Sequence, residues 1–116
     1  MNTPTEELRQ EVYHVVAAIP RGKVITYGQI AFLTGRPQNS RLVGHLLHGV
    51  PRELRLPCHR VVNASGRLVP GWSGQRALLE QEGVAFRPNG HVDLKASQWK
   101  FMETEALDIS GPPTRS

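Results

Sequence analysis

A single cysteine in 116 residues, Cys58, sets the strongest limit on how this chain can fold. One thiol can form no internal disulfide and cannot build a Cys-rich zinc site, so neither kind of cross-link stabilises the chain. The fold must rest on a hydrophobic core, and a hydrophobic share of 39% suffices for one modest core. We expect one domain over residues 1–101 and a disordered, polar tail over residues 102–116.

The sequence predicts a protein that stays in the cytoplasm, or in the nucleus of a eukaryote. It has no run of about 18 apolar residues, so no membrane span is expected. Residues 1–7 are polar and acidic, unlike a signal peptide. A free thiol also fits a reducing compartment.

The middle of the chain is strongly basic, although the net charge is only +4. The stretch from residue 21 to residue 76 holds one acid, Glu53, and nine basic residues: Arg21, Lys23, Arg36, Arg41, Arg52, Arg55, Arg60, Arg67 and Arg76. A basic centre between acidic ends favours one cationic face for a polyanion such as nucleic acid. The open alternative is that the arginines only solvate a surface.

The first predicted element is a helix from Pro4 to near Pro20. Thr3 can cap this helix, proline is favoured at the first helical position, and Glu6 stands three residues after the cap. Apolar residues recur at helical spacing and should face the core: Leu8, Val12, Val15, Val16 and Ile19.

Two shorter helices are predicted in the basic stretch. Thr26 can cap a helix over residues 27–33, and Asn39 or Ser40 can cap a second over residues 41–48. Two short helices joined by a tight break indicate a helix-turn-helix, which often binds DNA but can also be only architecture.

A β-hairpin and a further helix are predicted in the second half. Residues 60–62 and 67–69 flank Asn63-Ala64-Ser65-Gly66, which is typical of a turn between two strands. A loop over residues 70–74 then leads into a helix from about Gln75 to Glu82. The chain is therefore predicted to be mostly α-helical with a small β-hairpin.

The candidate reactive centre is Cys58, which His59 follows directly. A thiol is nucleophilic as the thiolate, and a nearby imidazole or cation lowers its pKa toward neutrality. The alternative is a small buried residue, because a lone cysteine usually packs like a hydrophobe and adjacent side chains on a strand point to opposite faces. The pair alone leaves both interpretations open.

The full run Pro57-Cys58-His59-Arg60-Val61-Val62 resembles the active-site motif of the O6-alkylguanine-DNA alkyltransferases. The order of elements is also similar, with Gly22-Lys23-Val24-Ile25-Thr26-Tyr27-Gly28, a helix-turn-helix and then the cysteine motif, and the likeness covers roughly residues 12–83. The resemblance implies a single winged helix-turn-helix-like DNA-binding domain, as in the C-terminal domain of that family. It also implies duplex DNA with O6-alkylguanine as the partner.

The resemblance assigns a catalytic set of Cys58, His59 and Glu82. In the family the glutamate holds the histidine, the histidine draws the proton from the cysteine through a water, and the thiolate takes the alkyl group permanently. Such a protein would be a single-turnover methylated-DNA–protein-cysteine methyltransferase. No metal or organic cofactor is implied, and we expect a monomer.

The resemblance also assigns five DNA-binding residues. Tyr27 matches the tyrosine that rotates the target nucleotide out, and Arg41 matches the arginine that fills the vacated space, since chemistry on a stacked base requires its extrusion. By resemblance Trp72 could stack on the flipped base and Ser73 could hydrogen-bond near O6, and Arg60 of the motif is grouped with them. Otherwise Tyr27 could pack at a helix start, Arg41 could contact a phosphate and Trp72 could be a core or lid aromatic.

The family has a second branch, the alkyltransferase-like proteins, which bind and flip alkylated guanine without accepting the alkyl group and recruit nucleotide excision repair proteins. They usually carry tryptophan at the position of Cys58. Val50 stands where active enzymes place an asparagine that supports the catalytic network, and the loop after Gly66 is shorter than in those enzymes. The sequence therefore predicts base flipping, with transfer to Cys58 favoured over a sensor and over a plain helix-turn-helix binder.

Overall fold

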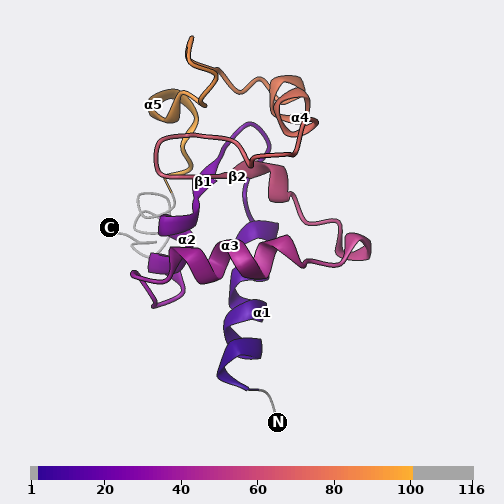
Figure 1. Cartoon of the computed structure of the whole chain (residues 1–116), viewed down its shortest axis with the longest axis vertical. Helices are drawn as coiled ribbons and strands as arrows, with labels where there is room; N and C mark the ends of the chain where they lie inside the picture. Colours follow the sequence, from indigo (N-terminus) through magenta and orange to yellow (C-terminus); the bar gives the residue numbers. More distant parts are fainter. Residues whose placement is uncertain (1–2, 101–116) are drawn as a thin grey trace, which may run out of the picture.

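The computed structural model describes residues 3–100, which form short helices around a two-stranded sheet (Figure 1). In chain order the elements are α1 (Pro4–Ala17), β1 (Ile25–Thr26), α2 (Tyr27–Leu33), α3 (Ser40–His48), η1 (Arg52–Leu54), η2 (Cys58–Arg60), β2 (Val61–Val62), α4 (Gln75–Gln81) and α5 (Leu94–Ser97), where η marks a 3₁₀ turn. The prediction of a mostly helical chain with a small sheet is confirmed.

Helix α1 begins as its sequence predicts. The Thr3 hydroxyl accepts a hydrogen bond from the Glu6 amide, and Pro4 occupies the first turn. The helix points away from the sheet along the longest axis of the domain (Figure 1). Leu8, Val12 and Val16 are its buried residues, so one stripe of α1 faces the core, as the helical spacing predicted.

The sheet divides the interior into two cores. Strands β1 and β2 run parallel with Ile25 opposite Val61 and Thr26 opposite Val62. Ile25 and Val61 pack into a larger core with α1, α2 and α3, whereas Val62 packs into a smaller core with Leu79 of α4. Successive strand residues point to opposite faces, which explains why neighbours in one strand enter different cores.

The predicted hairpin between residues 60–62 and 67–69 is wrong. The turn itself forms, because the Asn63 carboxamide oxygen accepts hydrogen bonds from the amides of Ser65 and Arg67. Val62, however, pairs with Thr26 of β1, and the Val69 amide donates to the side chain of Gln75. The Asn63 amide still donates to the Arg67 carbonyl, but residues 67–69 form no strand.

Gly66 is the glycine on which this turn depends. Its φ is +86°, and a Cβ there would lie 2.5 Å from the Val92 carbonyl oxygen. The Val92 amide donates to the Gly66 carbonyl, so the turn is tied to the smaller core.

Trp99 packs against the larger core, as predicted. The core position expected for Phe101 and the tail expected over residues 102–116 lie outside the described residues. Among the described helices, none combines the length and apolarity needed to cross a membrane.

Candidate functional site

The predicted helix-turn-helix is present as α2 and α3. Thr26 caps α2 through a capping box, in which its hydroxyl accepts from the Gln29 amide and the Gln29 side chain accepts from the Thr26 amide. This cap sets the direction in which α2 leaves β1 and places Tyr27 at the first position of the helix. A Cβ at Gly44 would lie 3.7 Å from the Tyr27 ring, so the ring lies close to the α3 backbone.

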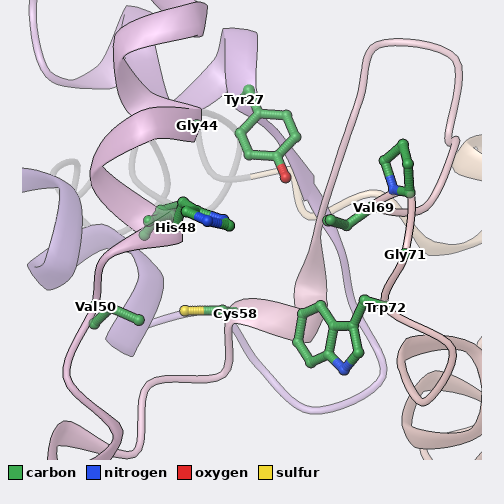
Figure 2. Close-up of a pocket in the computed structure, with 10 residues that line it drawn as sticks. Tyr27, Gly44, His48, Val50, Cys58, Val69, Gly71 and Trp72 are labelled. Carbon is green, nitrogen blue, oxygen red and sulfur yellow. The ribbon is translucent and has the colours of Figure 1, made fainter.

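Tyr27 and Cys58 line one pocket with a volume of about 380 Å³ (Figure 2). Its walls come from Tyr27 of α2, the second half of α3 with Val50, Cys58 of η2, and the loop over residues 69–72. This volume lies within the range of small-molecule sites, about 300–1,000 Å³. The structure therefore brings the predicted tyrosine and the predicted nucleophile to one concave surface.

Trp72 lines the same pocket, and Ser73 does not. The Trp72 side chain is 37% exposed, so an aromatic face remains available at the pocket wall. Ser73 is exposed on the same loop but lies outside the set of lining residues. The structure therefore separates these two predicted contacts.

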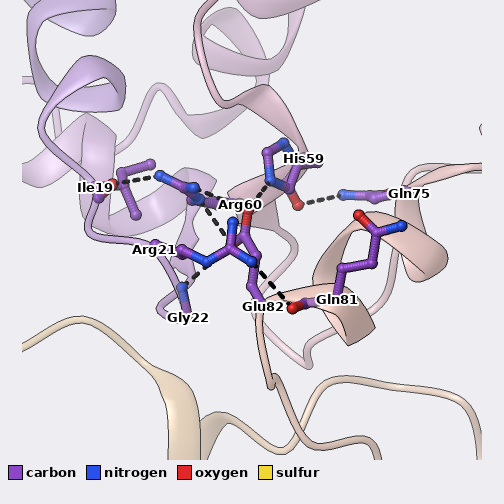
Figure 3. A network of polar contacts seen from close by, with 8 residues as sticks. All are labelled: Ile19, Arg21, Gly22, His59, Arg60, Gln75, Gln81 and Glu82. Carbon is purple, nitrogen blue, oxygen red and sulfur yellow. Dashed lines mark hydrogen bonds and ion pairs between the residues drawn. The ribbon is translucent and has the colours of Figure 1, made fainter.

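Glu82 joins His59 and Arg60 in a polar network outside the pocket lining (Figure 3). One Glu82 oxygen lies 2.7 Å from His59 Nε2 and 2.8 Å from Arg60 Nη2. The other accepts hydrogen bonds from Arg60 Nε at 2.9 Å and from the Gly22 amide at 3.2 Å. The predicted pairing of Glu82 with His59 is thus present in the structure.

These contacts decide the charge of Glu82. Its side chain is only 6% exposed, and burial opposes ionisation, but hydrogen bonds from Arg60, His59 and the Gly22 amide outweigh that cost. Together they lower the pKa of Glu82 from 4.5 to about 2. Glu82 is therefore a carboxylate at neutral pH and keeps one His59 nitrogen engaged.

The surroundings of Cys58 shift its pKa in the direction that disfavours the charged form, unlike those of Glu82. Burial raises the pKa of Cys58 above the ordinary thiol value. Burial, and to a lesser extent the nearby Cys58, also raise the pKa of Tyr27. Thiolate formation at Cys58 therefore needs help from a neighbouring cation or hydrogen-bond donor.

Cys58 and His59 face different ways on the η2 turn. The sulfur lines the pocket, whereas the His59 ring is bound to Glu82 outside the pocket lining (Figures 2 and 3). Within the described residues no hydrogen bond joins the two side chains. The structure thus places both predicted catalytic groups beside the pocket without direct contact.

Arg60, which the sequence groups with the DNA-binding residues, has a side chain that faces inward in the structure. Its guanidinium donates two hydrogen bonds to Glu82, and its Nη1 donates to the Ile19 carbonyl at 2.8 Å. The side chain is 15% exposed. Arg60 therefore links the segment that follows α1 to Glu82.

Gln75 is a site residue that sequence reasoning missed. It is fully buried, its amide nitrogen donates to the carbonyls of His59 and Val61, and its oxygen accepts from the Val69 amide at 2.7 Å. One side chain thus ties the pocket loop to the cysteine segment. No sequence signal marks it, because a glutamine in the first turn of a short helix is usually exposed.

Arg41 lies on a second, more open hollow beside the pocket. This hollow is lined by Tyr27, Gly28, Ser40, Arg41, Gly44, Asn63 and Ala64. Tyr27 and Gly44 belong to both hollows, so an arginine near the start of α3 stands next to the pocket entrance. No group of three His, Cys, Asp or Glu side chains that could hold a metal occurs among residues 3–100.

A helix-turn-helix beside a pocket lined by a thiol is the arrangement expected of a DNA-binding domain of the predicted family. Residues 7–84 match the family described as 6-O-methylguanine DNA methyltransferase, DNA binding domain. The chain belongs to this family, that of the O6-alkylguanine-DNA alkyltransferases, and its recognition from the cysteine motif is confirmed.

The relatives include both branches of the family. The chain is 42% identical over 95 residues to the DNA base-flipping protein of Escherichia coli, which covers 79% of this chain and 74% of that protein. It is similar to the crystal structure of Schizosaccharomyces pombe Atl1 with damaged DNA containing O6-carboxymethylguanine, at TM-score 0.72, 34% identity and coverage of 86% and 99%. It also resembles the Mycobacterium tuberculosis methyltransferase OGT in complex with DNA, at TM-score 0.59, 38% identity and coverage of 71% and 51%.

Proposed function

We propose that this protein binds duplex DNA, flips O6-alkylguanine into the pocket and transfers the alkyl group irreversibly to Cys58. The observation that carries the proposal is that the Cys58 sulfur lines the same pocket as Tyr27 and Trp72. A flipped base would lie between aromatic walls with its substituent near a nucleophile. The protein would act as a monomer in the cytoplasm, or in the nucleus of a eukaryote.

The two neighbouring hollows that share Tyr27 suggest how the base would enter the pocket. Tyr27 would press on the target nucleotide, and Arg41, in the open hollow, would enter the duplex where the base has left. Filling the vacancy offsets part of the unstacking cost, which is a few kcal/mol. Trp72 would then stack on the base inside the pocket.

The chemistry is one nucleophilic displacement. His59, which Glu82 holds, receives the thiol proton through a water, and the Cys58 thiolate attacks the alkyl carbon on O6. A sulfur–carbon bond forms as the carbon–O6 bond breaks, and the bonding electron pair leaves with the purine. Protonation of the purine restores guanine, and the thioether does not turn over.

The variant Cys58→Ala tests this mechanism. A duplex carrying a radiolabelled O6-methyl group should label the wild-type protein once and should not label the variant. The variant should still prefer the lesion duplex to a matched unmodified duplex in a gel-shift assay. Labelling of Cys58→Ala would overturn the proposal.

A second candidate, a lesion sensor that marks the base for nucleotide excision repair proteins, is favoured by the state of the thiol. Burial raises the pKa of Cys58, and Val50 brings no hydrogen-bond donor to the pocket. The relatives named base-flipping protein and Atl1 support this candidate as well. A sensor would bind O6-methylguanine DNA selectively and release it unchanged.

Lesion preference separates both candidates from an ordinary helix-turn-helix binder. Two duplexes of one sequence, with guanine or O6-methylguanine at one position, should compete unequally for the protein. Equal competition, together with dependence on the surrounding sequence, would support the ordinary binder. Salt dependence would not discriminate, because all three bind phosphates through basic side chains.

A further inference from the structure

His48 is the cation-forming side chain of the pocket. It is the last residue of α3 and lines the pocket together with Tyr27 and Cys58. Figure 2 shows its ring pointing into the space between the Tyr27 and Cys58 side chains. Within the described residues its side chain makes no hydrogen bond or ion pair, so the ring is available to the pocket.

Few ionisable side chains face His48 in the pocket. Tyr27 of α2 and Cys58 of η2 are the other titratable side chains of the lining, and no acid or arginine belongs to it. The loop over residues 69–72 and Val50 add no ionisable group. His48 lies in the last turn of α3, at the carbonyl end of the helix, where the helix carries partial negative charge.

His59 does not stabilise a Cys58 thiolate by direct contact, because its Nε2 is bonded to Glu82 and no hydrogen bond joins the His59 and Cys58 side chains. We propose that the imidazolium of His48 stabilises the Cys58 thiolate and so makes the thiol of this pocket reactive. His48 would thus compensate for the apolar Val50 on the same wall. In the proposed transfer, His48 would be the positively charged partner of the reacting sulfur. The biological meaning of this inference rests on the proposed function.

The test measures thiol reactivity without DNA. Iodoacetamide alkylates a thiolate, with formation of a sulfur–carbon bond and loss of iodide, and intact-protein mass spectrometry counts the adducts. Cys58 is the only cysteine of the chain, so a single adduct reports it. The rate is measured from about pH 5 to pH 10, a range that covers imidazole and thiol titration.

The variants are His48→Gln, His48→Lys and the matched control His45→Gln. His45 lies one turn earlier on α3, is exposed and does not line the pocket. His48→Gln should move the rising limb of the profile to higher pH and slow alkylation below neutrality about three- to tenfold. His48→Lys should match or exceed the wild-type rate, and His45→Gln should superimpose on wild type.

A His48→Gln profile identical to wild type would overturn the inference, and so would an equal shift in His45→Gln. An equal plateau rate at high pH shows that reagent access is unchanged. If His48→Gln folds poorly by thermal unfolding, His48→Lys decides, because alkylation slower than wild type would contradict a role for the charge. Absence of methyl transfer in wild type with a shifted His48→Gln profile would overturn the proposed function and leave this inference standing.

Discussion

The two sides of the η2 turn differ in how fully their polar groups are bonded. Behind the turn, Glu82 accepts hydrogen bonds from Gly22, His59 and Arg60, and its pKa falls to about 2. In front of it, Cys58 faces a pocket with apolar walls, and burial raises its pKa. The polar groups around Glu82 have hydrogen-bond partners within the protein, whereas the Cys58 thiol faces a pocket that a ligand could fill.

This difference separates the work of folding from the work of binding. The satisfied network bonds the side chain of His59 and the backbone of the cysteine segment to α4 and the residue that follows it, and Cys58 of that segment lines the pocket. The unsatisfied side keeps open the space and the aromatic faces that a flipped base would use. The following predictions test that division, beginning with the largest effect.

Removing the Glu82 carboxylate should have the greatest cost. Glu82→Ala leaves Arg60 without the partner that holds its charge, at 15% exposure, and should destabilise the protein by about 3–5 kcal/mol in urea unfolding. The matched control is Glu80→Ala on α4, whose carboxylate is exposed and pairs only with Arg76. That control should change stability by at most about 1 kcal/mol. Similar losses of unfolding free energy in Glu82→Ala and Glu80→Ala would contradict the claim that the Glu82 network stabilises the fold.

Lowering the pH should remove the stabilisation that ionised Glu82 gives to the wild-type protein. The pKa of Glu82 lies at about 2 in the folded state and near 4.5 in the unfolded chain, so its contribution is complete above about pH 4.5. It is lost as the pH falls from there toward about 2, and a shift of this size corresponds to about 3 kcal/mol. Glu82→Gln should flatten this acid limb in unfolding experiments at several pH values. Parallel limbs in the two proteins would contradict the assignment.

Gln75→Leu should be the next most damaging change. It leaves the His59 and Val61 carbonyls and the Val69 amide without their partner, which should cost about 2 kcal/mol. Because Val69 belongs to the pocket loop, lesion selectivity should fall as well. Gln81→Leu, exposed on the same helix, is the control and should stay within about 0.5 kcal/mol of wild type. Unchanged stability in Gln75→Leu would show that these contacts carry no weight.

Changing the pocket side should cost little. Cys58→Ser replaces a half-buried thiol whose sulfur has no hydrogen bond among the described residues, so the free energy of unfolding should change by less than about 1 kcal/mol. Binding of the lesion duplex should persist, and alkylation by iodoacetamide should disappear. A loss of several kcal/mol would show that Cys58 is a structural residue after all.

Two predicted helix caps are confirmed, whereas the side chain of Asn39 makes no cap hydrogen bond to α3 and the strand pairing was not predicted. Thr3 and Thr26 cap helices that begin where their sequences indicate, because capping depends on neighbours three residues away. The hairpin after Val62 failed, because the partner of Val62 is Thr26, far away in the chain. Local turn signals describe Asn63 correctly and cannot tell which strand pairs with the segment before it.

For the site, the sequence predicted the segment that carries Cys58 into the pocket but not how its neighbours are buried. The motif contains Cys58 and His59 and the family resemblance added Glu82, and in the structure the Glu82 side chain is bonded to His59 of η2. Arg60 faces inward and Gln75 is buried, and neither fact follows from residue type, because both side chains are usually exposed. Burial of a polar side chain depends on distant backbone groups that only the folded chain brings close.

The most direct test of the account is intact-protein mass spectrometry after incubation with a duplex that contains O6-methylguanine, followed by peptide mapping. The account predicts a gain of one methylene, located on the peptide that contains Cys58, and no gain with an unmodified duplex. An unchanged mass, in a protein that still binds the lesion duplex selectively, would contradict transfer and leave a sensor whose thiol is unused.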